Sequence, residues 1–281
     1  MSDNGNIIVY GVRRTGTSLF MAILANDKRL KLNNDETKLS GDDYKDLQPF
    51  YYEGPFVGGV QPNNEADYIA LGNNNLIKMM SYALSATPIE HIRKMKKIYV
   101  MNRYWVDQNN SALNLNLINI KNEIFNKNNL LYSCIKDKVK FMKEFRNDDG
   151  VEYGFNYSNL ILDMVNRDYI SKVIIINFES LYNTPEYIRK YLKFNGINVG
   201  DGMKLVNKKV SKYQKNTRDN LIEFKEGFFD YLDKLHNALA TGVIDETIVK
   251  EVIKWEPLIR ENVNNKLEYL KEKYNIGFDD I

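Results

Sequence analysis

Short apolar runs alternate with longer amphipathic stretches along the chain. Four of these runs predict strands, at residues 6–10, 76–79, 97–101 and 173–177. Segments with helical spacing follow them, beginning at Ser18, Pro88, about Val106 and Pro185, with further helices expected over 128–147 and 157–168. This alternation predicts an α/β fold of three layers, in which a parallel sheet is flanked by helices.

The last part of the chain is predicted to be helical, over residues 221–275. Asp245 is a candidate N-cap for a helix whose apolar stripe contains Ile248, Val252, Trp255, Ile259 and Val263. We therefore divide the chain into an α/β domain, residues 1–220, and a helical C-terminal extension, residues 221–281, packed on the same domain. Residues 33–74 are polar and aperiodic, and predict a long loop that is functional or mobile.

Composition narrows the class of protein. The 39 basic and 37 acidic residues give a net charge of +2, which argues against a general nucleic-acid binder but permits a local pocket for a small anion. The single cysteine, Cys134, excludes an internal disulfide and a multi-cysteine zinc site, and we interpret it as a small buried residue. The chain starts without the features of a signal peptide and has no apolar run of about 18 residues. We expect a cytoplasmic protein with no membrane partner.

A glycine loop follows the first predicted strand, at residues 11–18 (GVRRTGTS). Its spacing is that of the phosphate loop GxxxxGK[ST], with Thr17 in the place of the lysine. Backbone N–H groups and the start of the next helix can still cradle an anion there. Without the lysine that reaches the outer phosphates, we expect a shorter anion, a 5′-phosphate carrying one further group beside Arg14. A turn that binds no ligand remains the alternative for this pattern alone.

The run from Val12 to Leu19 (VRRTGTSL) resembles the 5′-phosphosulfate loop of sulfotransferases that use 3′-phosphoadenosine-5′-phosphosulfate (PAPS), usually written PKSGTT or PRSGTS. The resemblance implies a P-loop-containing sulfotransferase-like fold. It also implies that Arg14 contacts the bridge to the sulfate, while Arg13 stands where the family usually has proline. The donor would then be held by Arg13, Arg14, Thr15, Gly16, Thr17 and Ser18.

Residues 97–111 resemble the family's 3′-phosphate segment, a strand ending in Arg103 followed eight residues later by Ser111 on the next helix. A guanidinium offers a planar fork of donors that suits a phosphate. Taken singly, a surface arginine and a solvated serine are the simpler interpretation, but their register after the glycine loop favours a donor with a 3′-phosphate. A third match, residues 173–186, resembles the family segment written RYEDL…DPE, and we interpret Glu179 in it as structural.

The resemblance also implies a catalytic lysine and a base. Lys78, at the end of the second predicted strand, falls where the family places a lysine beside the transferred sulfate. Many cytosolic sulfotransferases have a histidine two residues later, but this chain has Met80. A carboxylate is then required, and Glu36 resembles the glutamate of the GEET segment in tyrosylprotein sulfotransferases, with Asp35 and Glu53 as rivals.

The chain has two histidines and one long basic run that could also belong to the site. The histidines, His91 and His236, are interpreted as surface or packing residues. A basic run over residues 206–218 occupies the place where the family closes a loop over the 3′-phosphate and adenine, which makes Lys209, Ser211 and Lys212 candidates. The alternative for that run is a solvated charged stretch.

Together these features predict an enzyme that transfers the sulfuryl group of PAPS to a hydroxyl or amine and releases 3′-phosphoadenosine 5′-phosphate (PAP), with no metal expected. The acceptor would be a glycan, a peptide or a small molecule, and the pattern is closest to tyrosylprotein and glycan-type members. A P-loop kinase or nucleotide hydrolase is an alternative, disfavoured by Thr17 and by the lack of a convincing strand-end aspartate for Mg²⁺. A non-catalytic PAP-binding member is another. The C-terminal helices would form a lid or a contact between copies of the chain.

Overall fold

The computed structural model describes residues 5–12, 14–32, 74–80, 84, 87–111, 150–206 and 221–274. Its centre is a five-stranded sheet in the order β2-β3-β1-β4-β5, in which every neighbouring pair is parallel. The strands are β1 (Ile7–Gly11), β2 (Lys31–Leu32), β3 (Asn75–Met80), β4 (Lys97–Asn102) and β5 (Val173–Asn177). Because all run in one direction, their carboxyl ends meet at one edge of the sheet.

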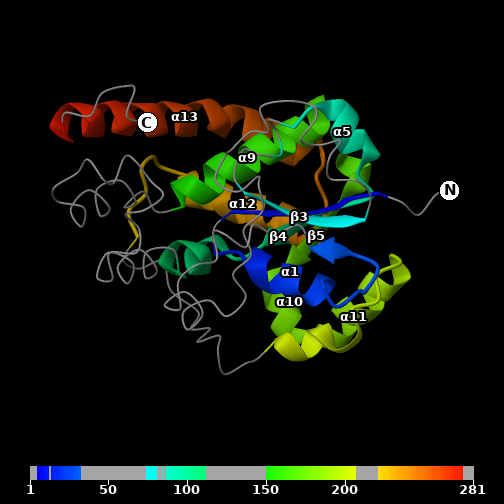
Figure 1. Cartoon of the computed structure of the whole chain (residues 1–281). Helices are drawn as coiled ribbons and strands as arrows, with labels where there is room; N and C mark the ends of the chain where they lie inside the picture. Colours follow the sequence, from blue (N-terminus) through cyan, green and yellow to red (C-terminus); the bar gives the residue numbers. More distant parts are fainter. Residues whose placement is uncertain are drawn as a thin grey trace.

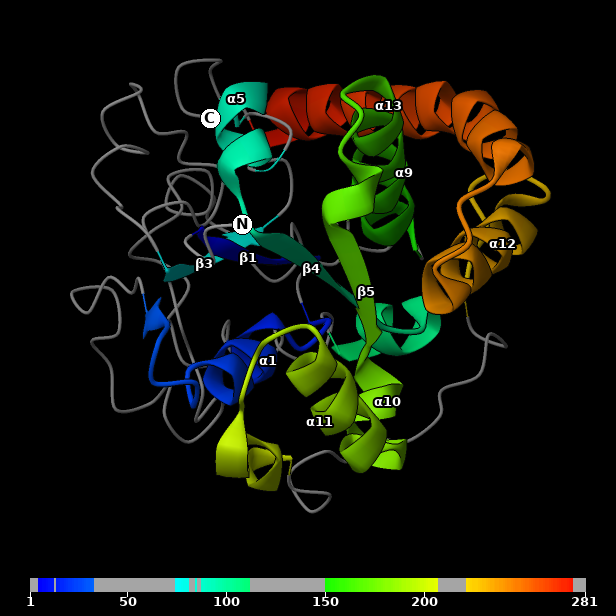
Figure 2. The same cartoon turned by 90° about the vertical axis from the view of Figure 1, so that its right-hand side faces the viewer.

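Helices cover both faces of this sheet (Figure 1). On one face lie α1 (Thr17–Leu24), α10 (Phe178–Asn183) and α11 (Pro185–Phe194). The other side carries α5 (Ile89–Lys94), α9 (Val151–Asn166), α12 (Phe228–Thr241) and α13 (Glu246–Tyr274), with α12 lying past β5 in Figure 2. Alternate residues of β1 belong to two hydrophobic cores, one on each face of the sheet. Ile8 and Tyr10 lie in one core, and Ile7 and Val9 lie in the other. The predicted three-layer α/β fold is therefore confirmed.

Several predicted boundaries differ from the observed ones. Helix α9 begins at Val151 rather than at 157, because Gly150 at φ 82° supplies the left-handed residue before its first turn. The short elements α10 and β2 were not predicted. Pro88 precedes α5 instead of opening it, since its ψ of 140° is extended. The helix predicted over 128–147, Cys134 and nearly all of the 33–74 loop lie outside the described residues.

The C-terminal helices pack on the α/β core. Asp245 accepts hydrogen bonds from the backbone N–H groups of Thr247 (2.9 Å) and Ile248 (3.0 Å), so the predicted N-cap is confirmed. The first four residues of the predicted stripe are buried in the same core cluster as α9, and Val263 packs against it. The boundary proposed at residue 220 falls in the undescribed 207–220 and stays a prediction. Within the described residues, no helix is both long and apolar enough to cross a membrane.

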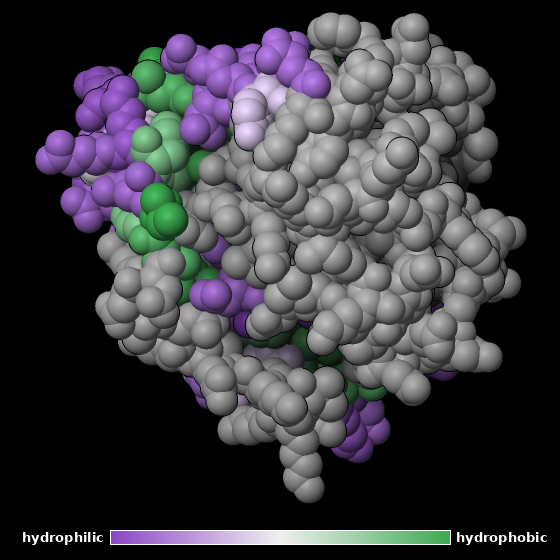
Figure 3. Space-filling view, turned by 90° about the vertical axis from the view of Figure 1, so that its left-hand side faces the viewer, coloured by the Kyte–Doolittle hydropathy of each residue, from purple (hydrophilic) through white to green (hydrophobic). Residues whose placement is uncertain are grey.

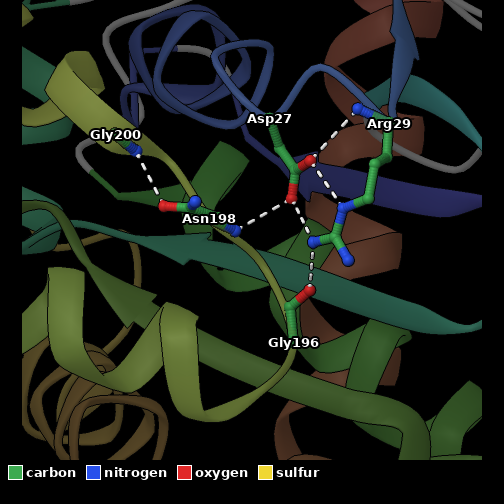
Figure 4. Close-up of polar contacts among 5 residues, drawn as sticks. All are labelled: Asp27, Arg29, Gly196, Asn198 and Gly200. Atoms are coloured by element: carbon green, nitrogen blue, oxygen red, sulfur yellow. Dashed lines mark hydrogen bonds and ion pairs between the residues drawn. The ribbon is translucent and has the colours of Figure 1, made fainter.

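A buried carboxylate joins the end of α1 to the loop after α11 (Figure 4). Asp27 is 4% exposed and accepts hydrogen bonds from the Arg29 guanidinium (2.6 and 2.9 Å) and from the Asn198 backbone N–H (2.8 Å). Arg29 also donates to the Gly196 carbonyl oxygen at 2.7 Å. These bonds, the Arg29 side-chain bond first, lower the pKa of Asp27 from 3.8 to about 2.

Replacing Asp27 with asparagine is expected to lower the free energy of unfolding at pH 7 by about 2 kcal/mol, or about 5 °C in Tm. Since the folded pKa lies below the unfolded one, this stabilisation is complete above about pH 4 and is lost as the pH falls towards 2. Thermal unfolding at pH 7 and pH 3 should therefore show a smaller difference at pH 3. Asp201→Asn, which alters an exposed pair with Lys204, is the control and should change Tm by less than about 1 °C. A difference unaffected by pH would contradict this account.

Candidate functional site

The glycine loop turns back on itself between β1 and α1. Arg14 (φ 67°) and Gly16 (φ 91°) both adopt the left-handed backbone conformation. Thr15 between them is fully buried, and both its backbone N–H (3.3 Å) and its hydroxyl (2.7 Å) donate to the Val12 carbonyl oxygen. The hydrogen bonds of Thr15 thus fix the turn, while Arg14 is half-buried.

The two glycines of the motif are required by packing. A Cβ on Gly11 would lie 2.5 Å from the Thr15 hydroxyl oxygen and 2.8 Å from the Thr17 methyl carbon. A Cβ on Gly16 would lie 2.4 Å from a ring carbon of Phe178, the first residue of α10. Glycine is therefore required at position 11 because the loop's own threonines lie so close to it, and at position 16 because Phe178 of α10 does.

The start of α1 is suited to an anion. Its N-cap residue is Gly16, which has no side chain to cap the helix, and its first turn contains no acidic residue. The helix dipole and the first N–H groups favour negative charge at this end. Figure 3 views the molecule from this side, and the described residues visible in it, both hydrophilic and hydrophobic, lie mainly at its upper left.

Ser111 and Arg103, two residues that the sequence predicts to bind the nucleotide, form hydrogen bonds with Arg14. Its guanidinium Nε donates to the Ser111 hydroxyl at 3.1 Å, across 97 residues of sequence. Arg103 Nη1 donates to the Arg14 carbonyl oxygen at 3.0 Å, and the Arg103 guanidinium lies over the Phe178 ring at 4.7 Å from its centroid. Because Ser111 lies on the helical residues 105–111 that follow β4, these contacts bring together the segments that follow β1 and β4.

Lys78 reaches the same end of α1 from β3. Its side chain is 5% exposed, and its ammonium donates to the Ser18 hydroxyl at 3.1 Å. Ser18 is the second residue of α1, and Lys78 is paired with Val9 of β1 in the sheet. The structure therefore brings Arg14, Lys78 and Arg103 to the region of one helix N-terminus.

Two polar residues outside the predicted site, Glu179 and His236, pack beside this region. Glu179, predicted to be structural, accepts a hydrogen bond from the Tyr104 backbone N–H at 3.1 Å, and burial raises its pKa. His236 of α12 lies against Asn102 and Tyr104, and burial lowers its pKa to about 4. It is a packing residue, as predicted, but it packs beside the candidate site. His91 is buried in α5.

The remaining predicted site residues lie outside the described residues: Arg13, Glu36, Lys209, Ser211 and Lys212, with the rival bases Asp35 and Glu53. Met80 ends β3, and its side chain is likewise not described. Among the described residues, no group of three or more His, Cys, Asp or Glu side chains is placed to hold a metal ion.

Gly16→Ala is expected to lower the free energy of unfolding by about 3 kcal/mol, because it combines a left-handed backbone with a contact on the Phe178 ring. The matched control is Gly196→Ala, where φ is +79° but nothing lies within 4 Å of the new Cβ, so about 1 kcal/mol is expected. Chemical denaturation of both variants measures the difference. Equal losses would show that Phe178 does not confine the loop.

Comparisons with known proteins found no matching family model and no matching curated protein. The structure is similar to mouse sulfotransferase SULT7A1 complexed with PAP (14% identity, TM-score 0.43, 89% of this chain and 88% of that chain). It is also similar to a sulfotransferase from Alicyclobacillus acidocaldarius (16%, 0.40, 91% and 96%) and to the sulfotransferase domain of the Synechococcus PCC 7002 olefin synthase (13%, 0.41, 92% and 96%). All three are sulfotransferases. At these TM-scores and identities, function has to be inferred from this chain's own side chains.

Proposed function

We propose that this chain is a PAPS-dependent sulfotransferase. The observation that carries the proposal is the contact of Arg14 with both Ser111 and Arg103 at the uncapped start of α1. A 5′-phosphate needs only the loop and the helix N-terminus. Arg103, after β4, and Ser111, on the following helix, can bind a second phosphate. They therefore favour a sulfuryl donor that carries a 3′-phosphate.

In this proposal the glycine loop, Thr17 and Ser18 bind the 5′-phosphosulfate, and Arg103 with Ser111 binds the 3′-phosphate. The loop lacks the lysine with which phosphate loops reach the outer phosphates of a nucleoside triphosphate. Arg13, Lys209, Ser211 and Lys212 are proposed to complete the donor site. No metal is required, because arginine and lysine supply the positive charge.

The reaction is an in-line displacement at sulfur. The acceptor oxygen or nitrogen forms a bond to sulfur, while the bond from sulfur to the 5′-phosphate oxygen breaks and its electron pair leaves with PAP. The acceptor's proton passes to a carboxylate, for which Glu36 is proposed. Lys78 and Arg14 stabilise the charge that grows on the sulfate oxygens and on the leaving phosphate.

Incubation with ³⁵S-labelled PAPS and a panel of saccharides, tyrosine peptides, phenols and amines tests the proposal. We expect label on at least one acceptor and an equal amount of PAP released. PAP binding without transfer to any member of the panel would favour a non-catalytic PAP-binding protein. Binding of ATP–Mg²⁺ in preference to PAP would contradict both and favour a kinase or nucleotide hydrolase.

A further inference from the structure

The chain around Arg103 is held by α12, which belongs to the C-terminal part of the sequence. Arg103 is flanked by Asn102 and followed by Tyr104 and Trp105, and each of these three neighbours contacts α12. Trp105, which is fully buried, donates its indole N–H to Asp233 at 2.8 Å. The guanidinium of Arg103 itself points the other way, to the glycine loop and Phe178.

Asn102 is the most constrained of these neighbours. It is fully buried, and its side-chain oxygen Oδ1 accepts a hydrogen bond from the Tyr153 hydroxyl at 2.7 Å. Its amide nitrogen donates to the Asn177 side-chain oxygen at 2.9 Å and faces His236 Nδ1 at 3.3 Å. An amide nitrogen can only donate, so His236 Nδ1 is the acceptor in this contact. The Tyr153 hydroxyl lies 3.4 Å from the same nitrogen.

His236 also contacts Tyr104, the residue that follows Arg103 in the sequence. Its ring meets the ring of Tyr104 edge to face, with the centroids 5.3 Å apart. The Tyr104 backbone N–H is in turn fixed by Glu179 at 3.1 Å. A single side chain of α12 therefore touches the residues immediately before and after Arg103, which limits the backbone movement available to that arginine.

We infer that His236 is a positioning residue for Arg103, so that selectivity for the donor's 3′-phosphate depends on helix α12. The inference rests on the proposed function, because it assigns Arg103 to the 3′-phosphate. A forked guanidinium binds phosphate well only when its orientation is held, and small displacements at such a site cost disproportionately in affinity. The 5′-phosphate site depends on the glycine loop and α1, and the contacts of His236 named above involve none of the described residues of that loop or helix.

The test compares the dissociation constants of PAP and adenosine 5′-monophosphate, measured by calorimetry on the full chain. His236→Leu removes the acceptor for Asn102 and is expected to reduce the preference for PAP about tenfold, with monophosphate binding changed less than about threefold. His236→Gln keeps a side-chain oxygen acceptor and should restore the preference to within about threefold of the wild type. Leu239→Ala, a buried change on the same helix, should lower Tm without changing the preference.

Each result decides the inference. A wild-type protein without preference for PAP overturns the proposed function and this inference together. A wild-type preference that His236→Leu leaves intact, or a loss that affects both ligands equally, overturns the inference alone. If the leucine variant does not fold, Tyr153→Phe takes its place, because it removes the hydrogen bond that orients Asn102. It is then expected to lower the preference about threefold, and an unchanged preference would overturn the inference.

Discussion

Lys78→Met is expected to lower sulfuryl-transfer turnover about 1,000-fold while changing PAP affinity less than about threefold. Lys78 is 5% exposed, and its ammonium is held 3.1 Å from the Ser18 hydroxyl at the start of α1. In the proposed reaction this cation acts mainly on the charge of the transferred sulfuryl oxygens, and PAP does not contain the sulfuryl group. Methionine is unbranched and only one heavy atom shorter than lysine, and it removes the charge together with the hydrogen bond to Ser18.

The matched control for Lys78 is Lys97→Met. Lys97 is the first residue of β4, so it lies at the opposite edge of the same sheet, and its replacement should leave turnover within about twofold. Single-turnover measurements with labelled PAPS separate transfer from donor binding. Full turnover in the Lys78 variant would show that the site is assigned to the wrong residues.

Arg103→Met is expected to weaken PAP binding about 100-fold, because two charge-assisted hydrogen bonds to a phosphate contribute about 3 kcal/mol. The affinity for adenosine 5′-monophosphate should fall less than about fivefold. This smaller loss is expected because the variant also loses the hydrogen bond from Arg103 to the Arg14 carbonyl oxygen in the glycine loop. Arg103→Lys keeps the charge without the planar fork of donors. Its affinity for PAP should lie between those of the wild type and Arg103→Met, about tenfold weaker than the wild type.

Arg189→Met provides the control for the loss of one positive charge. Arg189 is exposed on α11 and paired with Glu186 on the same helix, so neither ligand should be affected. Calorimetric titration of both ligands gives the comparison. Equal losses for PAP and the monophosphate in the Arg103 variant would mean that Arg103 supports the loop rather than binding the 3′-phosphate.

The strongest local patterns predicted the fold. The bounds of the β-branched strands β1 and β5 agree with the sequence prediction within one residue. All residues of β1 are buried, whereas buried and half-buried residues alternate along β5. Helix α11 begins at Pro185, which fits a first helical position, and it shows a polar and an apolar face. Elements with few residues, such as β2 and α10, depend on neighbours distant in sequence and left no local pattern to detect.

The candidate site was only partly predictable. The rule that loops meet at the carboxyl edge of a parallel sheet brings the glycine loop, Lys78 and Arg103 together without any coordinates. The Arg14–Ser111 bond and the packing of Phe178 under Gly16 depend on side-chain positions across the sheet, which spacing does not encode. His236 was interpreted as a packing residue because its place beside Tyr104 results from the docking of α12.

The central claim is that this chain recognises a nucleotide with a 3′-phosphate and a short 5′ group. Calorimetric titration of the wild-type protein with PAP, adenosine 5′-monophosphate and ATP–Mg²⁺ tests it most directly. The account predicts that PAP binds at least about 100-fold more tightly than either of the others, as expected for a second, arginine-bound phosphate. Equal affinity for PAP and the monophosphate, or tighter binding of ATP–Mg²⁺, would contradict it.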